Sequence, residues 1–335
     1  MTNPAFNTDA PDKRWIMDRN FALEAVRVTE AAALASSHWT GRGLEKDADQ
    51  AAVNAMREAL NGMTIDGTVV IGEGERDEAP MLYIGEKVGT GEGPRIDIAL
   101  DPLEGTTLCA TSGPNSLAVV AMGEHGSFLH APDVYMDKIA VGGGLPEAVV
   151  DIDASIAENV KNLARAKNKD VSELTVVILK RDRHGEKIAK LREAGCRVQL
   201  IPDGDVAGVI ATATAMTGVD MYLGIGGAPE GVLAAAALRC IGGQMQGRLL
   251  FEGEDEQKER ARRMGITDFN RKYALTDMAK GDVMFAATGV TDGSMLKGVK
   301  RWAGGASTHS IVMRSATGTV RWIEAQHNFG LKTEI

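Results

Sequence analysis

Hydrophobic residues recur along this chain in two spacings, one typical of amphipathic helices and one typical of strands. Alanine-rich segments at 21–36 and 49–60 predict two helices near the start. Further helices are predicted at 186–193, 205–213 and 229–239. Short runs of β-branched and aliphatic residues predict strands, which lie at 68–71, 96–100, 117–122, 174–179, 197–201, 219–223, 283–288 and 309–314.

The order of these elements predicts a mixed α/β protein without internal repeats. The N-terminal half is of α+β type, and in the C-terminal half helices and strands alternate as they do around a parallel sheet. A charged stretch at 252–263 interrupts this alternation. The length predicts two subdomains, 1–160 and 161–335, with a boundary between 155 and 170, while a single compact unit fits it as well.

Composition and charge exclude several classes of protein. A net charge of −9 argues against nucleic acid as a partner, because like charges repel its phosphates. No apolar run approaches the length of a membrane span, and the first twenty residues lack the apolar stretch of a signal peptide. Three scattered cysteines predict neither a disulfide framework nor a zinc site. We expect a cytoplasmic protein with no membrane partner.

The segment Asp101-Pro102-Leu103-Glu104-Gly105-Thr106 carries the clearest chemistry in the sequence. Two carboxylates three residues apart, where a strand ends, can converge on one divalent cation, and a hydroxyl follows two positions later. The same residues are also typical of a helix start, with Asp101 as N-cap and Pro102 in the first turn. Residues 106–114 are a poor helix sequence, which favours the metal site.

Several further motifs resemble those of one phosphatase family. The segment above is similar to the Asp-Pro-[Ile/Leu]-Asp-Gly-Thr motif of metal-dependent, lithium-sensitive sugar and inositol phosphatases. More specific motifs, which follow in order over nearly the whole chain, lie at 71–75, 77–85, 131–136, 201–205 and 224–231. With them the chain resembles the class II fructose-1,6-bisphosphatases. This resemblance implies a layered αβαβα sugar-phosphatase fold, an N-terminal metal-binding subdomain and a C-terminal substrate-binding subdomain.

The resemblance also implies a carboxylate site for Mg²⁺ or Mn²⁺, hard cations that prefer oxygen ligands. The acids that match the family's metal ligands are Asp49, Glu73, Asp101, Glu104 and Glu230. Glu230 follows Pro229, so an ordinary helix start explains an acid there as well. Thr106 is the candidate for orienting the attacking water, with Glu75 or Asp77 as a neighbouring acid.

Substrate contacts are carried over from the family to matching positions. They are Glu104, Gly105, Thr106, Tyr135, Arg181, Asp182, Arg183, Asp203, Gly204, Asp205 and Gly227. Arg181 and Arg183 would hold a second phosphate far from the metals, although without the resemblance a solvated basic turn would be the preferred explanation. Family members commonly carry Lys-Pro-Arg-His where this chain has 181–184, so Asp182 places an acid beside the expected phosphate. Lys46 lies one position away from the family's usual lysine and is given no role.

The expected function is hydrolysis of the 1-phosphate of fructose 1,6-bisphosphate to fructose 6-phosphate and phosphate, a step of gluconeogenesis. An enzyme that also cleaves sedoheptulose 1,7-bisphosphate, or an inositol-monophosphatase-like enzyme, remains an alternative. A dinucleotide-binding oxidoreductase is disfavoured, because Pro229 occupies the third glycine position of the fingerprint that begins at Gly224. The expected partner is a small sugar bisphosphate, and we expect a homo-oligomer, either a dimer or a tetramer.

Overall fold

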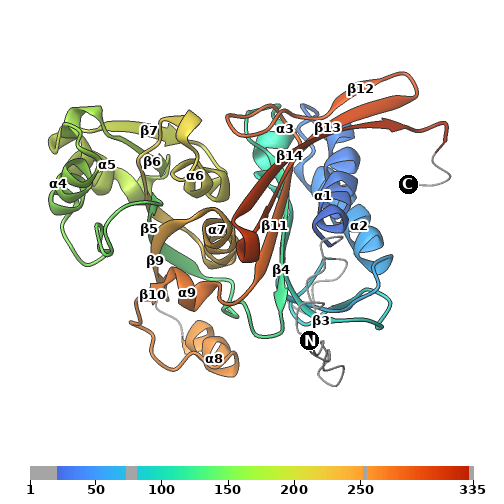
Figure 1. Ribbon diagram of the computed structural model, residues 1–335, viewed down its shortest axis with the longest axis horizontal. Coiled ribbons are helices and arrows are strands. Elements are labelled where there is room, and N and C mark those ends of the chain that lie inside the picture. Colours follow the sequence, from blue (N-terminus) through green and yellow to red (C-terminus); the bar gives the residue numbers. More distant parts are fainter. Residues whose placement is uncertain (1–20, 73–80, 252–254, 332–335) are drawn as a thin grey trace, which may run out of the picture.

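The computed structural model describes residues 21–72, 81–251 and 255–331, which form two β-sheets separated and flanked by helices (Figure 1). The first sheet is ordered β12-β13-β11-β4-β3-β1-β2, with β14 paired to β13. Within it only β1 and β3 pair in parallel. Its strands are β1 (Asp66–Ile71), β2 (Lys87–Val88), β3 (Arg95–Glu104), β4 (Leu117–Glu124), β11 (Val283–Gly289), β12 (Lys300–Trp302), β13 (Gly305–Arg314) and β14 (Thr319–Asn328).

The second sheet is ordered β10-β9-β5-β8-β6-β7 and is of mixed direction. Strand β6 pairs in parallel with β7 and β8, whereas β5 pairs antiparallel with both β8 and β9. The expectation of a parallel sheet in this half is therefore correct only for one side of it. The strands are β5 (Tyr135–Gly142), β6 (Thr175–Leu179), β7 (Arg197–Ile201), β8 (Met221–Gly227), β9 (Gly243–Leu250) and β10 (Tyr273–Ala274).

Helices fill three layers around these sheets. One layer, α1 (Phe21–Ser36) and α2 (Glu45–Asn61), covers the outer face of the first sheet, and α4 (Ile156–Lys167) and α5 (Gly185–Glu193) cover the second (Figure 1). Between the sheets lie α6 (Asp205–Ala211) and α7 (Ala228–Ile241). Shorter helices are α3 (Thr106–Ala110), α8 (Asp255–Arg263) and α9 (Leu275–Met278). The five layers confirm the predicted αβαβα arrangement.

Helix α7 is apolar on all sides because it is packed between the sheets. It contacts β11 and β13 on one side and β5, β8 and β9 on the other. Its run of alanines, buried with its leucines, lets both sheets approach the helix closely. The start of this helix therefore lies at the junction of the two sheets, where it can present a side chain to both.

All of the predicted helices and strands are found. The longer elements that were missed are β5, β9, β14, α4 and α8, and the short β2, β10, β12, α3 and α9 were not predicted either. The missed strands carry polar residues among apolar ones, which weakens their period, and β14 lies at the sheet edge with much of its surface exposed. The chain enters the second sheet at β5 and returns to the first at β11. The division near residue 160 stays a prediction. No helix in the described parts of the chain has the length and apolar character needed to cross a lipid bilayer.

Candidate active site

The conspicuous acidic segment lies where β3 ends. The strand continues through Glu104, with an irregular register against β4 between Asp101 and Glu104. Gly105 then adopts a φ of 76° and caps α3, the short helix that begins at Thr106. The alternative in which Asp101 caps a helix is therefore wrong. The poor helix sequence after Glu104 forms only a short helix of five residues. A side chain at 105 would be strained at this φ, which explains the glycine.

Four of the predicted residues meet at a cavity of about 290 Å³ between the two sheets. They come from four different elements: Asp49 from α2, Asp101 from β3, Thr106 from α3 and Glu230 from α7. The complete lining is Asp49, Gly72, Met81, Leu100, Asp101, Thr106, Asp133, Pro229, Glu230 and Leu233. The other predicted acids of the catalytic group, Glu73, Glu75 and Asp77, lie outside the described residues.

Burial, and for two of the three groups the charges of neighbouring acids, raises the pKa of the carboxyls at and beside this cavity. Burial, followed by the charges of Asp101 and Asp205, raises the pKa of Glu104 well above its usual value. Burial and then Asp205 raise the pKa of Glu230 to about 7, although Lys138 opposes this. Burial also raises the pKa of Asp49. The cavity therefore concentrates negative charge that water does not solvate well, and a cation placed there would relieve this.

Two buried oxygens support a cation at this position. Asp49 Oδ1 and Glu230 Oε2 are both buried and lack a hydrogen-bond partner within the described atoms. Buried carboxylate oxygens are rarely left without a partner, and a metal ion is one explanation. Among the described residues, no three side chains are already arranged to coordinate an ion. The donor set, made of carboxylates alone, fits Mg²⁺ or Mn²⁺.

Gly227, the residue that precedes α7, allows the Glu230 carboxylate to fold back over the start of the helix. A Cβ atom at position 227 would lie 1.8 Å from Glu230 Oε2. Any side chain there would push this carboxylate out of its place. Glycine at position 227 is therefore needed for the placement of the Glu230 carboxylate. An ordinary acid in a first helical turn would not require a glycine there.

The two arginines expected to hold a phosphate lie beside the second sheet. Arg183 stacks over the ring of Tyr135 at 4.6 Å and donates a 2.8 Å hydrogen bond to the Ile225 carbonyl. Arg181 pairs with Asp203 at 3.4 Å and also donates to the Pro202 carbonyl. Arg183 is exposed and Arg181 is half-buried. Asp182, between them, is exposed at the start of a 3₁₀ turn, Asp182–His184.

The predicted sugar-binding segment touches the metal-binding acids. Gly204 has a φ of 82°, and Asp205 begins α6 with only 5% of its surface exposed. The next amide, that of Val206, donates a 3.2 Å hydrogen bond to Glu104 Oε1. Burial raises the pKa of Asp203, and Arg181 opposes the rise. The segment that is expected to bind the sugar therefore also holds one of the expected metal ligands.

The sequence analysis missed three polar residues around this site. Asp133 lines the cavity, and Lys138 is buried on β5 beside Asp205. His184 is buried and donates from Nδ1 to the Leu179 carbonyl, while Nε2 accepts from the Ile225 amide. This network holds the ring neutral, and burial lowers the pKa of His184. A signal for Lys138 existed only in part: it directly precedes the apolar residues 139–141 of β5, although Asp137 lies on its other side.

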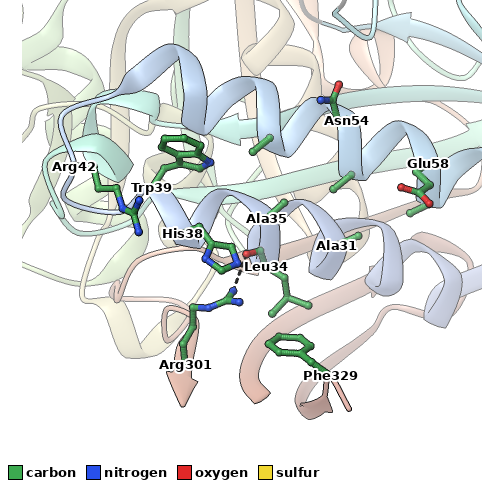
Figure 2. Close-up of a pocket in the computed structure, with 13 residues that line it drawn as sticks. Ala31, Leu34, Ala35, His38, Trp39, Arg42, Asn54, Glu58, Arg301 and Phe329 are labelled. Atoms are coloured by element: carbon green, nitrogen blue, oxygen red, sulfur yellow. Dashed lines mark hydrogen bonds between the residues drawn. The ribbon is translucent and has the colours of Figure 1, made fainter. Parts of the chain in front are cut away.

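A larger hollow of about 820 Å³ lies between α1 and α2 on the outer side of the first sheet. Figure 2 shows Trp39, Arg42 and Arg301 around one end of it and Glu58 toward the other. Arg301 donates a 3.0 Å hydrogen bond to the Leu34 carbonyl there. None of the predicted site residues lines this hollow. Asp49, Asp101 and Glu230 line the smaller cavity instead.

Comparison with known proteins agrees with this geometry. Residues 19–327 match the family model described as bacterial fructose-1,6-bisphosphatase, glpX-encoded. The chain belongs to this family, whose members are metal-dependent phosphoric monoester hydrolases. It is 49% identical over 324 residues to the fructose-1,6-bisphosphatase 1 class 2 of Escherichia coli strain K12, covering 93% of this chain and 96% of that protein. The class 2 enzyme of Shigella flexneri has the same identity and coverage.

A solved structure, inositol monophosphatase from Anabaena (Nostoc) sp. PCC 7120, is more distantly similar. It shares 15% identity with this chain at a TM-score of 0.30, over 58% of this chain and 72% of that one.

Proposed function

We propose that this protein hydrolyses the 1-phosphate of D-fructose 1,6-bisphosphate at the carboxylate cavity, with Mg²⁺ or Mn²⁺. The activity, class 2 fructose-1,6-bisphosphatase in gluconeogenesis, follows from the family. The observation that supports the cavity as its site is a pair of buried oxygens, on Asp49 and Glu230, that have no hydrogen-bond partner among the described residues and lie beside Asp101 and Thr106.

The ions would be held by Asp49, Asp101, Glu104 and Glu230, together with Glu73, which lies outside the described residues. Bound there, they would neutralise charge on the phosphate and lower the pKa of an attacking water. Asp101, near the end of β3, lines the cavity and would supply a carboxylate ligand there. Glu104, whose Oε1 accepts a hydrogen bond from the Val206 amide, would be a further ligand beside Asp101.

Thr106 would orient the attacking water, because its hydroxyl lies at the cavity wall and can both donate and accept a hydrogen bond. Its own amide and that of Gly105 would hold oxygens of the reacting phosphate. The proton that leaves the water would pass to Glu75 or Asp77. The roles of these two acids stay predictions of the sequence.

The phosphate that does not react would be held by Arg181 and Arg183. Stacking on Tyr135 fixes the guanidinium plane of Arg183 before the substrate binds, which lowers the entropy lost on binding. Asp203 and Gly204, with Gly227 and the Tyr135 hydroxyl, would contact the sugar. Asp182 would weaken the phosphate site by its charge. We also propose a cytoplasmic homo-oligomer, a dimer or a tetramer.

The test is phosphate release from fructose 1,6-bisphosphate, sedoheptulose 1,7-bisphosphate and inositol 1-phosphate, each with Mg²⁺, Mn²⁺, Zn²⁺ or excess chelator. We expect turnover of fructose 1,6-bisphosphate with Mg²⁺ or Mn²⁺, less with Zn²⁺, and none with the chelator. Undiminished turnover in chelator would contradict the mechanism. A preference for inositol 1-phosphate would contradict the substrate, and equal turnover of both bisphosphates would make the enzyme bifunctional.

A further inference from the structure

Lys138 is a buried lysine that no part of the proposed reaction uses. It lies in the middle of β5 with 1% of its surface exposed, and glycines stand opposite it on both neighbouring strands, Gly224 on β8 and Gly247 on β9. An ammonium group is costly to bury, so its position requires partners that compensate for the lost hydration.

Two partners come from the first residues of two different helices. Lys138 Nζ forms a short ion pair with Asp205 Oδ2 at the start of α6. It also donates a 2.9 Å hydrogen bond to the carbonyl of Gly227, which precedes α7. The Tyr222 hydroxyl lies 3.5 Å from the same oxygen of Asp205. Lys138 therefore joins α6 and α7 at the ends that face the cavity.

Each of these helix starts holds one of the expected metal ligands. At α6, the Val206 amide next to Asp205 donates to Glu104 Oε1. At α7, the Glu230 carboxylate folds back against Gly227. A shift of either helix start would move one glutamate relative to the other. Lys138 thus links the two helix starts that hold these glutamates.

The surrounding packing leaves room for this arrangement only because glycines line it. A Cβ at Gly226 would lie 2.2 Å from Asp205 Oδ2 and 3.0 Å from Lys138 Nζ, and one at Gly231 would lie 3.2 Å from Lys138 Cδ. The lysine side chain runs through this space to reach both helices. Two such glycines beside one buried charge indicate that the ammonium group has to occupy this position to reach both partners.

We propose that Lys138 is a positioning residue, which fixes the spacing of Glu104 and Glu230 for the divalent cation through Asp205 and Gly227. Asp205 then serves mainly as the partner of Lys138 rather than as an acceptor for the sugar. This inference rests on the proposed metal site. Residues that orient metal ligands typically change metal affinity or activity by about 10- to 100-fold when they are replaced.

The main test is the double variant Lys138→Met with Asp205→Leu. Removing one partner leaves a buried charge unpaired, whereas replacing both by apolar residues is often neutral for stability. Because the net charge of the site is unchanged, a change in cation affinity reports on geometry. We expect Mn²⁺ binding, measured by electron paramagnetic resonance without substrate, to weaken at least about tenfold, while the Tm without metal stays near the wild-type value.

A second variant, Gly226→Ala, keeps both charges but displaces the Asp205 carboxylate, and it should also weaken Mn²⁺ binding. The matched control is Lys187→Met with Asp137→Asn. Lys187 and Asp137 form an ion pair at 2.6 Å, and Asp137 is the residue next to Lys138 in β5. Side chains of adjacent strand residues point to opposite faces. This control should leave Mn²⁺ binding unchanged.

The outcomes separate this inference from the proposed function. If the wild-type protein itself does not bind Mn²⁺, the proposed metal site is wrong. If the wild type binds Mn²⁺ and either folded variant, the double variant or Gly226→Ala, binds it with the same affinity, then Lys138 only stabilises the fold. Activity restored to the folded variants by excess Mn²⁺ would support positioning, because a purely structural defect would not respond to the concentration of the ion.

Discussion

Glu230→Gln should make the metal-free protein more stable above neutral pH. The pKa of Glu230 is raised from 4.5 to about 7, first by burial and then by Asp205. The folded protein therefore holds this proton more tightly than the unfolded chain does. Its contribution to stability is fully present below pH 4.5 and is lost as the pH rises from 4.5 to about 7. Glutamine does not ionise and avoids this loss.

The two pKa values set the size of the effect. A difference between 4.5 and about 7 corresponds to about 3 kcal/mol of stability lost from the wild type at pH 8. For a chain of 335 residues, an unfolding entropy of about 2.1 cal/mol/K per residue converts this into roughly 4 °C of Tm. The same substitution removes a metal ligand, so kcat should fall at least about a hundredfold, or about 2.7 kcal/mol.

The assay is differential scanning calorimetry in excess chelator at about pH 5 and about pH 8. Between these values, the Tm of the wild type should fall by roughly 4 °C relative to that of Glu230→Gln. Mn²⁺ at about 100 times its Kd should then stabilise the wild type by about 2.7 kcal/mol and the variant much less. Glu256→Gln, an exposed acid on α8, is the control and should behave as the wild type.

A lower Tm of Glu230→Gln than of the wild type at pH 8 in chelator would refute the reasoning. Ionisation of the buried Glu230 carboxyl would then not destabilise the folded protein. If Glu230→Gln also kept its full response to Mn²⁺ and its turnover, Glu230 would be only an acid at the start of a helix.

Three other variants test the remaining parts of the site. Glu104→Gln should lower kcat at least about a hundredfold in the phosphate-release assay, and wild-type turnover would remove it from the ligand set. Gly227→Ala should reduce Mn²⁺ affinity, because the new methyl group collides with the Glu230 carboxylate; an unchanged affinity in a Mn²⁺ titration would contradict this. Arg183→Ala should raise KM for fructose 1,6-bisphosphate roughly ten- to a hundredfold with little change for fructose 1-phosphate, while the exposed Arg192→Ala does neither. Equal losses on both substrates would place Arg183 near the reacting phosphate.

Much of the fold could be predicted because local pattern and packing agree. Some elements are buried over most of their length, among them helices α1 and α7 and strands β4 and β11. Their sequences are therefore rich in apolar residues, from which the elements can be predicted. The prediction failed at β5, where Asp137 and Lys138 interrupt the apolar residues, and at the edge strand β14. The burial of Lys138 can be explained only when its partners Asp205 and Gly227 are known. Those partners are distant from it in the sequence.

The sequence by itself determined the chemistry of the site: the acids at 101 and 104, the glycine and threonine that follow, and the family to which these motifs belong. Only the tertiary structure decided which acids share a cavity, because Asp49 and Glu230 reach Asp101 from separate helices. The structure likewise decided that the pKa of Glu104 and that of Glu230 are raised. Burial and Coulomb interaction depend on distances through space, and neighbouring residues in the sequence do not set those distances.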